Sequence, residues 1–116
     1  MLSVIGQIAV TVRDIRRATA FYRDILALKF LFATGNLAFF DCHGVRLMLD
    51  QIEPPTASIL YFKVPDIRVE AAELKSRGVV FEDEPHMIAR MPDHELWMTF
   101  FRDSENNLMA LMSEVR

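Results

Sequence analysis

The chain opens with apolar and polar residues in alternation over positions 5–12, the pattern of a β-strand with one buried face. One face carries Ile8, Val10 and Val12, and the other carries Gln7, Ala9 and Thr11. Asp14 is an expected helix N-cap, because its carboxylate can accept hydrogen bonds from the first backbone N–H groups of a helix. Apolar residues then recur at helical spacing until about Leu28, so a strand followed by an amphipathic helix is predicted.

The rest of the chain reads as strands around a second helix. Strands are predicted over 29–32, 37–41, 45–50, 58–64, 95–102 and 108–113, with one more of uncertain length that starts at 79–81 and runs toward Arg90. Asp66 repeats the N-cap signal, and Gly78 suits the left-handed residue that ends many helices. Pro54-Pro55 cannot lie in a central strand. Residues 51–57 are therefore predicted to be a linker.

The chain also contains an internal repeat. Val12–Arg16 and Val64–Arg68, which starts 52 residues later, both end a predicted strand and begin a predicted helix. A Phe-Phe pair followed by a polar turn and an apolar strand recurs at 39–49 and 100–111. A duplicated strand–helix–strands unit predicts an α+β fold in which one curved sheet has a cleft between its halves. We expect one domain over 1–116, with the first module at about 4–50 and the second at about 58–114.

Composition narrows the class of protein. The 116 residues are 52% hydrophobic and 25% charged, which is ordinary for a globular domain. The formal net charge of −3 and the lack of a basic run argue against a nucleic-acid partner. No stretch is long and apolar enough to be read as a membrane span, so no membrane partner is expected. A single cysteine, Cys42, excludes an internal disulfide and fits a reducing cytoplasm.

Three segments give the chain a family resemblance: residues 5–15, the helix residues 20–26, and residues 101–108. Together with the repeat, they resemble the vicinal oxygen chelate superfamily, which includes glyoxalase I, bleomycin-resistance proteins, extradiol dioxygenases and methylmalonyl-CoA epimerase. The resemblance implies two tandem βαβββ modules that form a curved, partly closed mixed sheet around a cleft, with the helices on the outer face. It also implies a homodimer.

In metal-using members of that family, four strand positions supply the metal ligands, usually His, Glu or Gln. By resemblance, these positions fall on Gln7, Met48, Ile59 and Ala110. Only Gln7 carries an oxygen that a divalent cation of this chemistry could use, since a thioether is a poor ligand for it and Ile and Ala offer none. We therefore expect no family-type metal and no cofactor.

Other metal-ligating or nucleophilic residues lie in turns. Cys42 and His43 are adjacent in a hairpin turn, where neighbouring residues rarely face each other and no third group is evident to orient them. His86 and His94 could approach each other if residues 86–90 and 95–99 pair as a hairpin. With Asp93 or Glu95 they would then form an accessory metal or acid–base site.

Strand alternation extends the four family positions to a larger candidate ligand site. The neighbours two positions away share their face, and Trp97 and the phenylalanine pairs add stacking surface. The alternative is a cleft filled by its own side chains, in particular methionines. The candidate ligand-binding residues are Gln7, Arg46, Met48, Ile59, Tyr61, Lys63, Trp97 and Ala110.

These observations favour metal-independent binding of a small apolar or aromatic molecule in the cleft, and an anionic one where Arg46 and Lys63 point inward. The alternative is a metal-dependent lyase, isomerase or dioxygenase of the same superfamily with non-standard ligands. A third hypothesis is a metal-free enzyme that uses Tyr61, Lys63 or His94 for proton transfer, and a fourth is a structural or protein-interaction role. No catalytic residue is assigned.

Overall fold

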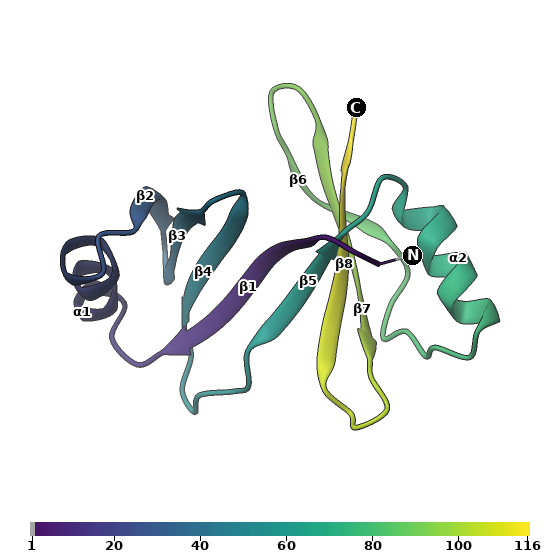
Figure 1. Ribbon diagram of the computed structural model, residues 1–116, viewed down its shortest axis with the longest axis horizontal. Coiled ribbons are helices and arrows are strands. Elements are labelled where there is room, and N and C mark those ends of the chain that lie inside the picture. Colours follow the sequence, from purple (N-terminus) through teal and green to yellow (C-terminus); the bar gives the residue numbers. More distant parts are fainter. Residues whose placement is uncertain (1) are drawn as a thin grey trace. The chain divides into compact units, whose positions relative to one another are not determined.

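Each half of the internal repeat builds a unit of its own in the computed structural model, which describes residues 2–116 (Figure 1). One unit comprises Gln7–Ile59, and the other comprises the chain up to Gly6 together with Leu60–Arg116. Each unit contains one helical segment and one βαβββ succession of elements. The predicted duplication is therefore present in the backbone.

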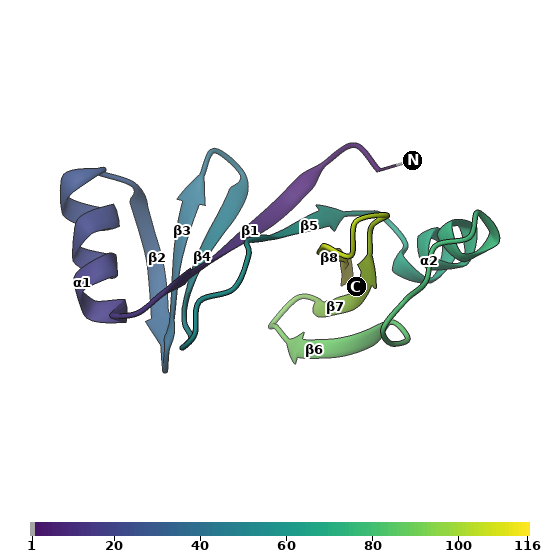
Figure 2. The same ribbon diagram turned by 90° about the horizontal axis from the view of Figure 1, so that it is seen from below.

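The Gln7–Ile59 unit has the strand order β2-β3-β4-β1, in which β1 and β4 are parallel and the other neighbours are antiparallel. Its helix α1 lies along one side of β2, β3 and β4 (Figure 2). Phe40 and Leu49 are fully buried beneath that helix, together with Ala38. The elements are β1 (Ile5–Val12), α1 (Ile15–Ala20), the π-helical turn η1 (Phe21–Ile25), β2 (Lys29–Thr34), β3 (Leu37–Cys42) and β4 (Val45–Gln51).

Two side chains fix the start of α1. Asp14 accepts a hydrogen bond from the backbone N–H of Arg17 at 3.1 Å, as the N-cap prediction requires. Gln51, at the end of β4, accepts another from the N–H of Ile15 at 2.8 Å. The helix continues through η1, and Ala27 then takes a positive φ of 57°, which ends it just before the predicted limit.

A bulge in β2 changes which side of the sheet its aromatic residues face. Phe30 pairs with Phe40, but Phe32 pairs with Phe39, so Leu31 is an extra residue. Residues two apart normally share a face, and an inserted residue reverses this. Phe30 therefore packs with Phe40 on the α1 side, at 5.6 Å between ring centroids, and Phe32 lies on the opposite side.

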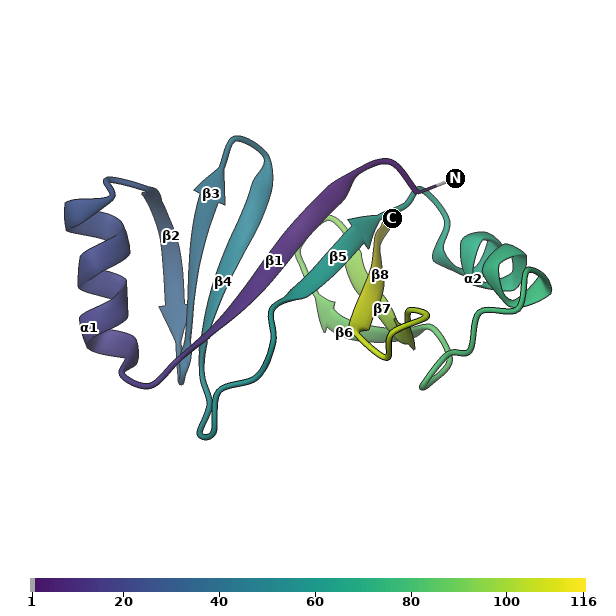
Figure 3. The same cartoon turned by 60° about the horizontal axis from the view of Figure 1, so that its bottom comes forward.

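The second unit repeats the plan with the order β5-β8-β7-β6, in which β5 and β8 are parallel (Figure 3). Asp66 caps α2 by accepting from the N–H groups of Arg68 and Val69 at 3.1 and 3.3 Å. The helix covers a core that includes fully buried Leu111 and buried Phe101. The elements are β5 (Ile59–Lys63), α2 (Ile67–Ser76), β6 (His86–Arg90), β7 (Glu95–Arg102) and β8 (Leu108–Val115).

The strand expected from residue 79 toward Arg90 is interrupted. Phe81 makes one isolated bridge to Phe101, and β6 begins only at His86. Between them, the Asp83 carboxylate accepts hydrogen bonds from the Phe100 N–H at 2.9 Å and the Thr99 hydroxyl at 2.7 Å. The Asp83 side chain thus accepts the hydrogen bond of a β7 backbone N–H group that a continuous neighbouring strand would otherwise have paired.

The observed elements confirm the predicted α+β class and the two tandem βαβββ modules with mixed pairing. In both units the helix covers a mainly apolar face of its strands, although the buried polar residues Thr99 and Ser113 share this face in the second unit. Over residues 2–116, no helix has the length and apolar character needed to cross a membrane. The assignment of residues 1–116 to a single domain stays a prediction.

Candidate functional site

A short side-chain hydrogen bond joins Gln7 and Arg46 on neighbouring strands. The parallel register of β1 and β4 places the two residues side by side. The Nε of Arg46 donates to Oε1 of Gln7 at 2.6 Å, and Gln7 is only 1% exposed. The guanidinium carbon of Arg46 lies 4.9 Å from the centroid of the Phe39 ring. A buried amide and an aromatic ring thus hold a cation in one orientation.

Apolar side chains surround this pair. The rings of Phe32 and Phe39 are stacked at 4.5 Å with an interplanar angle of 25°, and Met48 is the register partner of both Phe39 and Ala9. Phe39 is 6% exposed and Phe32 is 44% exposed, so one ring supports the other at the surface. These six residues define what we call the Arg46 face: Gln7, Ala9, Phe32, Phe39, Arg46 and Met48.

The Arg46 face lies on the side of the sheet away from α1. The residues adjacent to it in sequence, such as Phe40, Leu47 and Leu49, belong to the core under α1. Because strand side chains alternate between the two sides, the face residues must point the other way. Alternation correctly predicted that Gln7, Arg46 and Met48 share a face.

The residues at the family's metal positions do not fit a divalent cation. Met48 offers a thioether, and Ile59 and Ala110 offer no donor atom. The Gln7 oxygen already accepts from Arg46 at 2.6 Å, so an ion bound to that oxygen at about 2.1 Å would lie within about 5 Å of the arginine Nε. At an effective dielectric constant of about 20, the repulsion between a divalent ion and the guanidinium would be about 7 kcal/mol. One amide oxygen cannot compensate for this.

Three of the other predicted site residues lie together in the second unit. Tyr61 and Ala110 are register partners and both are buried, and Tyr61 makes an edge-on contact with Phe100 at 5.9 Å. Lys63 lies two residues further along β5, and its Nζ is 3.6 Å from a Glu114 carboxylate oxygen. Ile59 is half-buried at the start of β5 and belongs to the Gln7–Ile59 unit.

Trp97 lies on the opposite sheet side from Tyr61 and Ala110, so grouping it with them was wrong. Its register partner is Ser113, and it packs against the core cluster beneath α2. The physical reason is alternation along β7, in which Trp97 shares its side with Phe101, whereas Phe100 shares the side of Tyr61. The stacking surface of Trp97 therefore serves the helical side of its unit.

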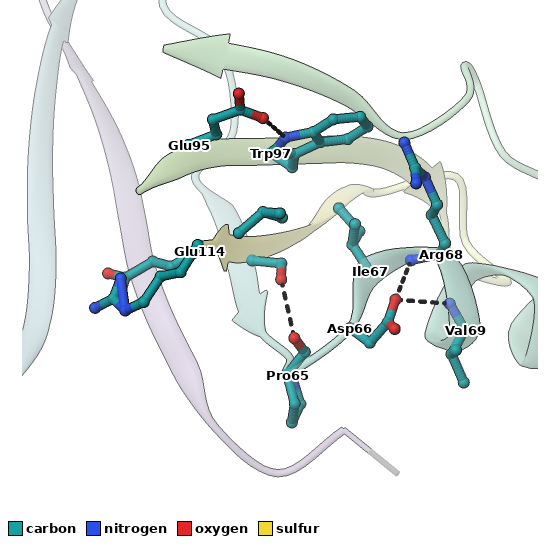
Figure 4. Close-up of a pocket in the computed structure, with 11 residues that line it drawn as sticks. Pro65, Asp66, Ile67, Arg68, Val69, Glu95, Trp97 and Glu114 are labelled. Atoms are coloured by element: carbon teal, nitrogen blue, oxygen red, sulfur yellow. Dashed lines mark hydrogen bonds and ion pairs between the residues drawn. The ribbon is translucent and has the colours of Figure 1, made fainter. Parts of the chain in front are cut away.

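Trp97 instead lines a pocket of about 550 Å³ at the N-terminal end of α2 (Figure 4). The guanidinium of Arg68 lies 4.6 Å from the centre of the indole, and the indole Nε1 donates to Glu95 at 3.0 Å. Sequence reasoning missed Arg68 here, although an arginine in the first turn of a predicted helix was a visible signal. The lining residues are Pro65, Asp66, Ile67, Arg68, Val69, Glu95, Trp97, Ser113, Glu114, Val115 and Arg116.

Two acidic residues that line this pocket form ion pairs, one with a lining residue and one with Arg90 outside it. Glu114 is 3.2 Å from Arg116, and Glu95 is 3.1 Å from Arg90. Both acids are partly exposed, so these ion pairs contribute little to stability.

The structure separates the two histidines proposed as an accessory site. His86 is opposite Met98 at one end of the β6–β7 hairpin, whereas His94 lies at its turn, about 13 Å of strand away. The His94 ring is 2.7 Å from Asp93, and this hydrogen bond holds the pKa of the Asp93 carboxyl below its usual range. Within residues 2–116, no three His, Cys, Asp or Glu side chains gather as a metal site.

Cys42 and His43 do not have the arrangement of a nucleophile and its base. His43 is exposed and has a positive φ of 53°, the left-handed conformation of a tight turn. Cys42 is half-buried at the end of β3, opposite Val45. The residues serve the β3–β4 turn, in line with the view that neighbours in a turn seldom face each other.

The comparisons with known proteins agree with this architecture. The family model described as Glyoxalase/Bleomycin resistance protein/Dioxygenase superfamily matches residues 4–111. No curated protein matches the sequence.

Among solved structures, a variant of Streptomyces coelicolor methylmalonyl-CoA epimerase in complex with 2-nitronate-propionyl-CoA aligns with a TM-score of 0.79 at 19% identity, covering 100% of both chains. The Mn(II)-bound glyoxalase from Novosphingobium aromaticivorans aligns with a TM-score of 0.79 at 18% identity, covering 98% of this chain and 40% of that one. A hypothetical protein from Bacillus halodurans C-125 gives 0.78 at 18% identity, with 97% and 94% covered. At such identities the similarity shows the fold.

Proposed function

Because the chain belongs to the Glyoxalase/Bleomycin resistance protein/Dioxygenase superfamily, we propose that it binds a small aromatic molecule on the Arg46 face, and that it does so without a metal ion. We place this activity in the cytoplasm, where its single cysteine, Cys42, would stay reduced. Two solved structures of the same fold are a complex with a CoA derivative and a Mn(II)-bound enzyme, so both kinds of site are relevant precedents.

The observation that carries the proposal is the fixed Gln7–Arg46 pair beside stacked aromatic rings. Small-molecule sites combine apolar contact area with a few polar groups that orient the ligand. Phe32 supplies exposed ring surface, Phe39 supports it from beneath, and Arg46 supplies one oriented charge. This combination supports ligand binding on the Arg46 face.

The metal-free part of the proposal follows from the donor atoms. Met48, Ile59 and Ala110 provide no oxygen or imidazole nitrogen, and the Gln7 oxygen is engaged by a cation. A family-type ion at these positions would need ligands from elsewhere in the protein.

The test is binding of an aromatic fragment panel, followed by amide chemical shifts before and after treatment with EDTA. We expect hits that shift the amides of β2, β3 and β4 equally in both samples. Phe32→Ala should weaken binding about tenfold, because an exposed stacking ring is lost. Phe21→Ala is the matched control, since Phe21 is 49% exposed and lies on η1, away from the Arg46 face.

A different result would favour the second hypothesis. If chelation abolishes binding and Mn²⁺ or Zn²⁺ restores it, the protein is a metal-dependent lyase, isomerase or dioxygenase with non-standard ligands. If no fragment binds, the proposed function is wrong.

We further propose that the protein forms a homodimer through the edge of β2. All six β2 residues are exposed, and Leu31 is a large apolar residue on this edge strand. Exposed apolar edge strands are usually covered by another element or another copy. Light scattering after size exclusion should give a dimer for the wild type and a monomer for Leu31→Lys. Val69→Lys, at an exposed site on α2, should stay dimeric, and a monomeric wild type would contradict the proposal.

A further inference from the structure

One cation in the pocket at the N-terminal end of α2 has no acidic partner among residues 2–116. This cation is the Arg68 guanidinium, which contacts the Trp97 ring instead of a carboxylate. We propose that the pocket binds a small aliphatic monocarboxylate and that the Arg68 guanidinium holds the carboxylate group. This site is additional to the Arg46 face, and all of its residues belong to the other unit.

The first step is that the pocket has room for a small molecule. Its volume of about 550 Å³ falls within the range of small-molecule sites, and it lies between the first turn of α2, the start of β7 and the end of β8 (Figure 4). Its buried lining residues are Ile67 and Ser113, and the Ser113 hydroxyl donates to the Pro65 carbonyl at 3.3 Å. Val69 and Val115 are exposed lining residues, so much of the lining is aliphatic.

The second step is that Arg68 is positioned but keeps its donors. Its guanidinium carbon lies 4.6 Å from the centroid of the Trp97 ring, and the indole Nε1 donates to Glu95 at 3.0 Å, which fixes the ring. Contact with a ring attracts the charge but supplies no oxygen to accept from the guanidinium N–H groups. In the part of the chain that the structure describes, no other side chain supplies one, so these donors are open to a ligand.

The third step is that the other charges beside the pocket have partners. Glu114 is 3.2 Å from Arg116, and Glu95 is 3.1 Å from Arg90. The Asp66 carboxylate accepts from two backbone N–H groups in the first turn of α2. The end of the helix is therefore already capped by the protein and is not the group that would hold the ligand.

The fourth step is the chemical class of the ligand. A guanidinium is planar and matches the two oxygens of a carboxylate through parallel N–H bonds. The pocket is also lined by three carboxylates, those of Asp66, Glu95 and Glu114, which disfavour a second negative charge on the ligand. A single carboxylate on a compact aliphatic body therefore fits the pocket better than a phosphate ester or a dicarboxylate does.

The experiment uses Trp97 as the reporter, because it is the only tryptophan of the chain and lines this pocket. Two transparent probes of nearly equal shape, cyclohexanecarboxylate and cyclohexanecarboxamide, are titrated into the full chain, and Trp97 fluorescence and its indole Nε1–H resonance are followed. We expect the wild type to bind the carboxylate at least about tenfold more tightly than the amide. Raising NaCl from about 0.05 to 0.5 M should weaken carboxylate binding and leave amide binding unchanged, because salt screens the charge.

Three variants separate the charge of Arg68 from charge in general. Arg68→Met should make the affinities for the two probes equal, and Arg68→Lys should retain part of the carboxylate preference. Arg77→Met is the matched control, because it removes an exposed cation from the other end of α2, and it should leave the preference unchanged. If Arg68→Met fails to fold, the probe comparison and the salt dependence of the wild type decide the question.

The outcomes that overturn the inference are distinct from those that overturn the proposed function. Equal binding of the two probes to the wild type overturns the inference, as does a carboxylate preference that survives in Arg68→Met. The inference is also overturned if neither probe changes the fluorescence or the indole resonance of Trp97. Phe32→Ala, which tests the Arg46 face, should leave both probe affinities unchanged, so either proposal can fail without the other.

Discussion

Truncation of Leu49 tests both the core under α1 and the assignment of the chain to one domain. Leu49 is fully buried and packs with Ala38 and Phe40. Leu→Ala at such a site removes the transfer free energy of the side chain and leaves a cavity, which together cost about 3 kcal/mol. For a chain of this length, that free energy corresponds to a fall in Tm of about 12 °C.

The assay uses the position of the single tryptophan. Trp97 belongs to the core under α2, in the other unit, whereas far-UV circular dichroism reports the helices and strands of both units. If residues 1–116 unfold as one cooperative domain, Leu49→Ala should lower the Tm of the Trp97 fluorescence transition as much as that of the dichroism transition.

Leu111→Ala is the matched control, because Leu111 is also fully buried but packs in the cluster that contains Trp97. It should lower the fluorescence Tm by about the same 12 °C, whether the units unfold together or separately. A Trp97 transition that stays at the wild-type temperature in Leu49→Ala, with a biphasic dichroism curve, would refute the single-domain prediction. No shift in either signal would refute the burial argument.

Two further predictions concern one close contact and one loop. Gly6→Ala should lower the free energy of unfolding by about 1–2 kcal/mol in urea denaturation. The reason is that a Cβ at this position would lie 2.7 Å from the Met112 sulfur and 3.0 Å from the Lys63 Cβ. An unchanged urea midpoint would show that these neighbours move aside. Hydrogen bonds from the side chain and backbone of Asn107 lower the pKa of the Asp103 carboxyl in the folded protein. The stability that these bonds contribute is therefore present at neutral pH. It is lost only as the pH falls below about 4 and through the lowered pKa of the folded state. A carboxyl carbon titration of Asp103 with a midpoint at or above the usual value of about 3.9 would contradict this.

Much of the fold could be predicted because its signals are local. Asp14 and Asp66 cap the two helices as expected, since a carboxylate before an amphipathic run acts through its nearest backbone N–H groups. The repeat predicted a duplicated strand–helix–strands unit, and the parallel pairing of β1 with β4 and of β5 with β8 shows the same plan in both modules. Periodicity and local capping carry this information without any knowledge of register.

The errors arose where a non-local contact or an inserted residue overrides alternation. No sequence signal reveals the Leu31 bulge, which places Phe30 and Phe32 on opposite sides of the sheet. The separation of His86 from His94 depends on which residues pair across the β6–β7 hairpin. Trp97 was grouped with Tyr61 because the sequence of β7 does not indicate which of its two faces the helix covers.

The Gln7–Arg46 pair shows how the loss of metal donors and the presence of a cation are connected. Alternation predicted that both residues share a face, but only the register of a parallel pair separated by α1, β2 and β3 makes them neighbours. A buried amide oxygen without a partner would cost about 1–3 kcal/mol, so Gln7 could not be left unpaired among Met48 and Ala9. Arg46 satisfies that oxygen and at the same time puts a charge on the face. The same hydrogen bond therefore satisfies the buried amide and occupies the one oxygen that a divalent cation could use at these positions.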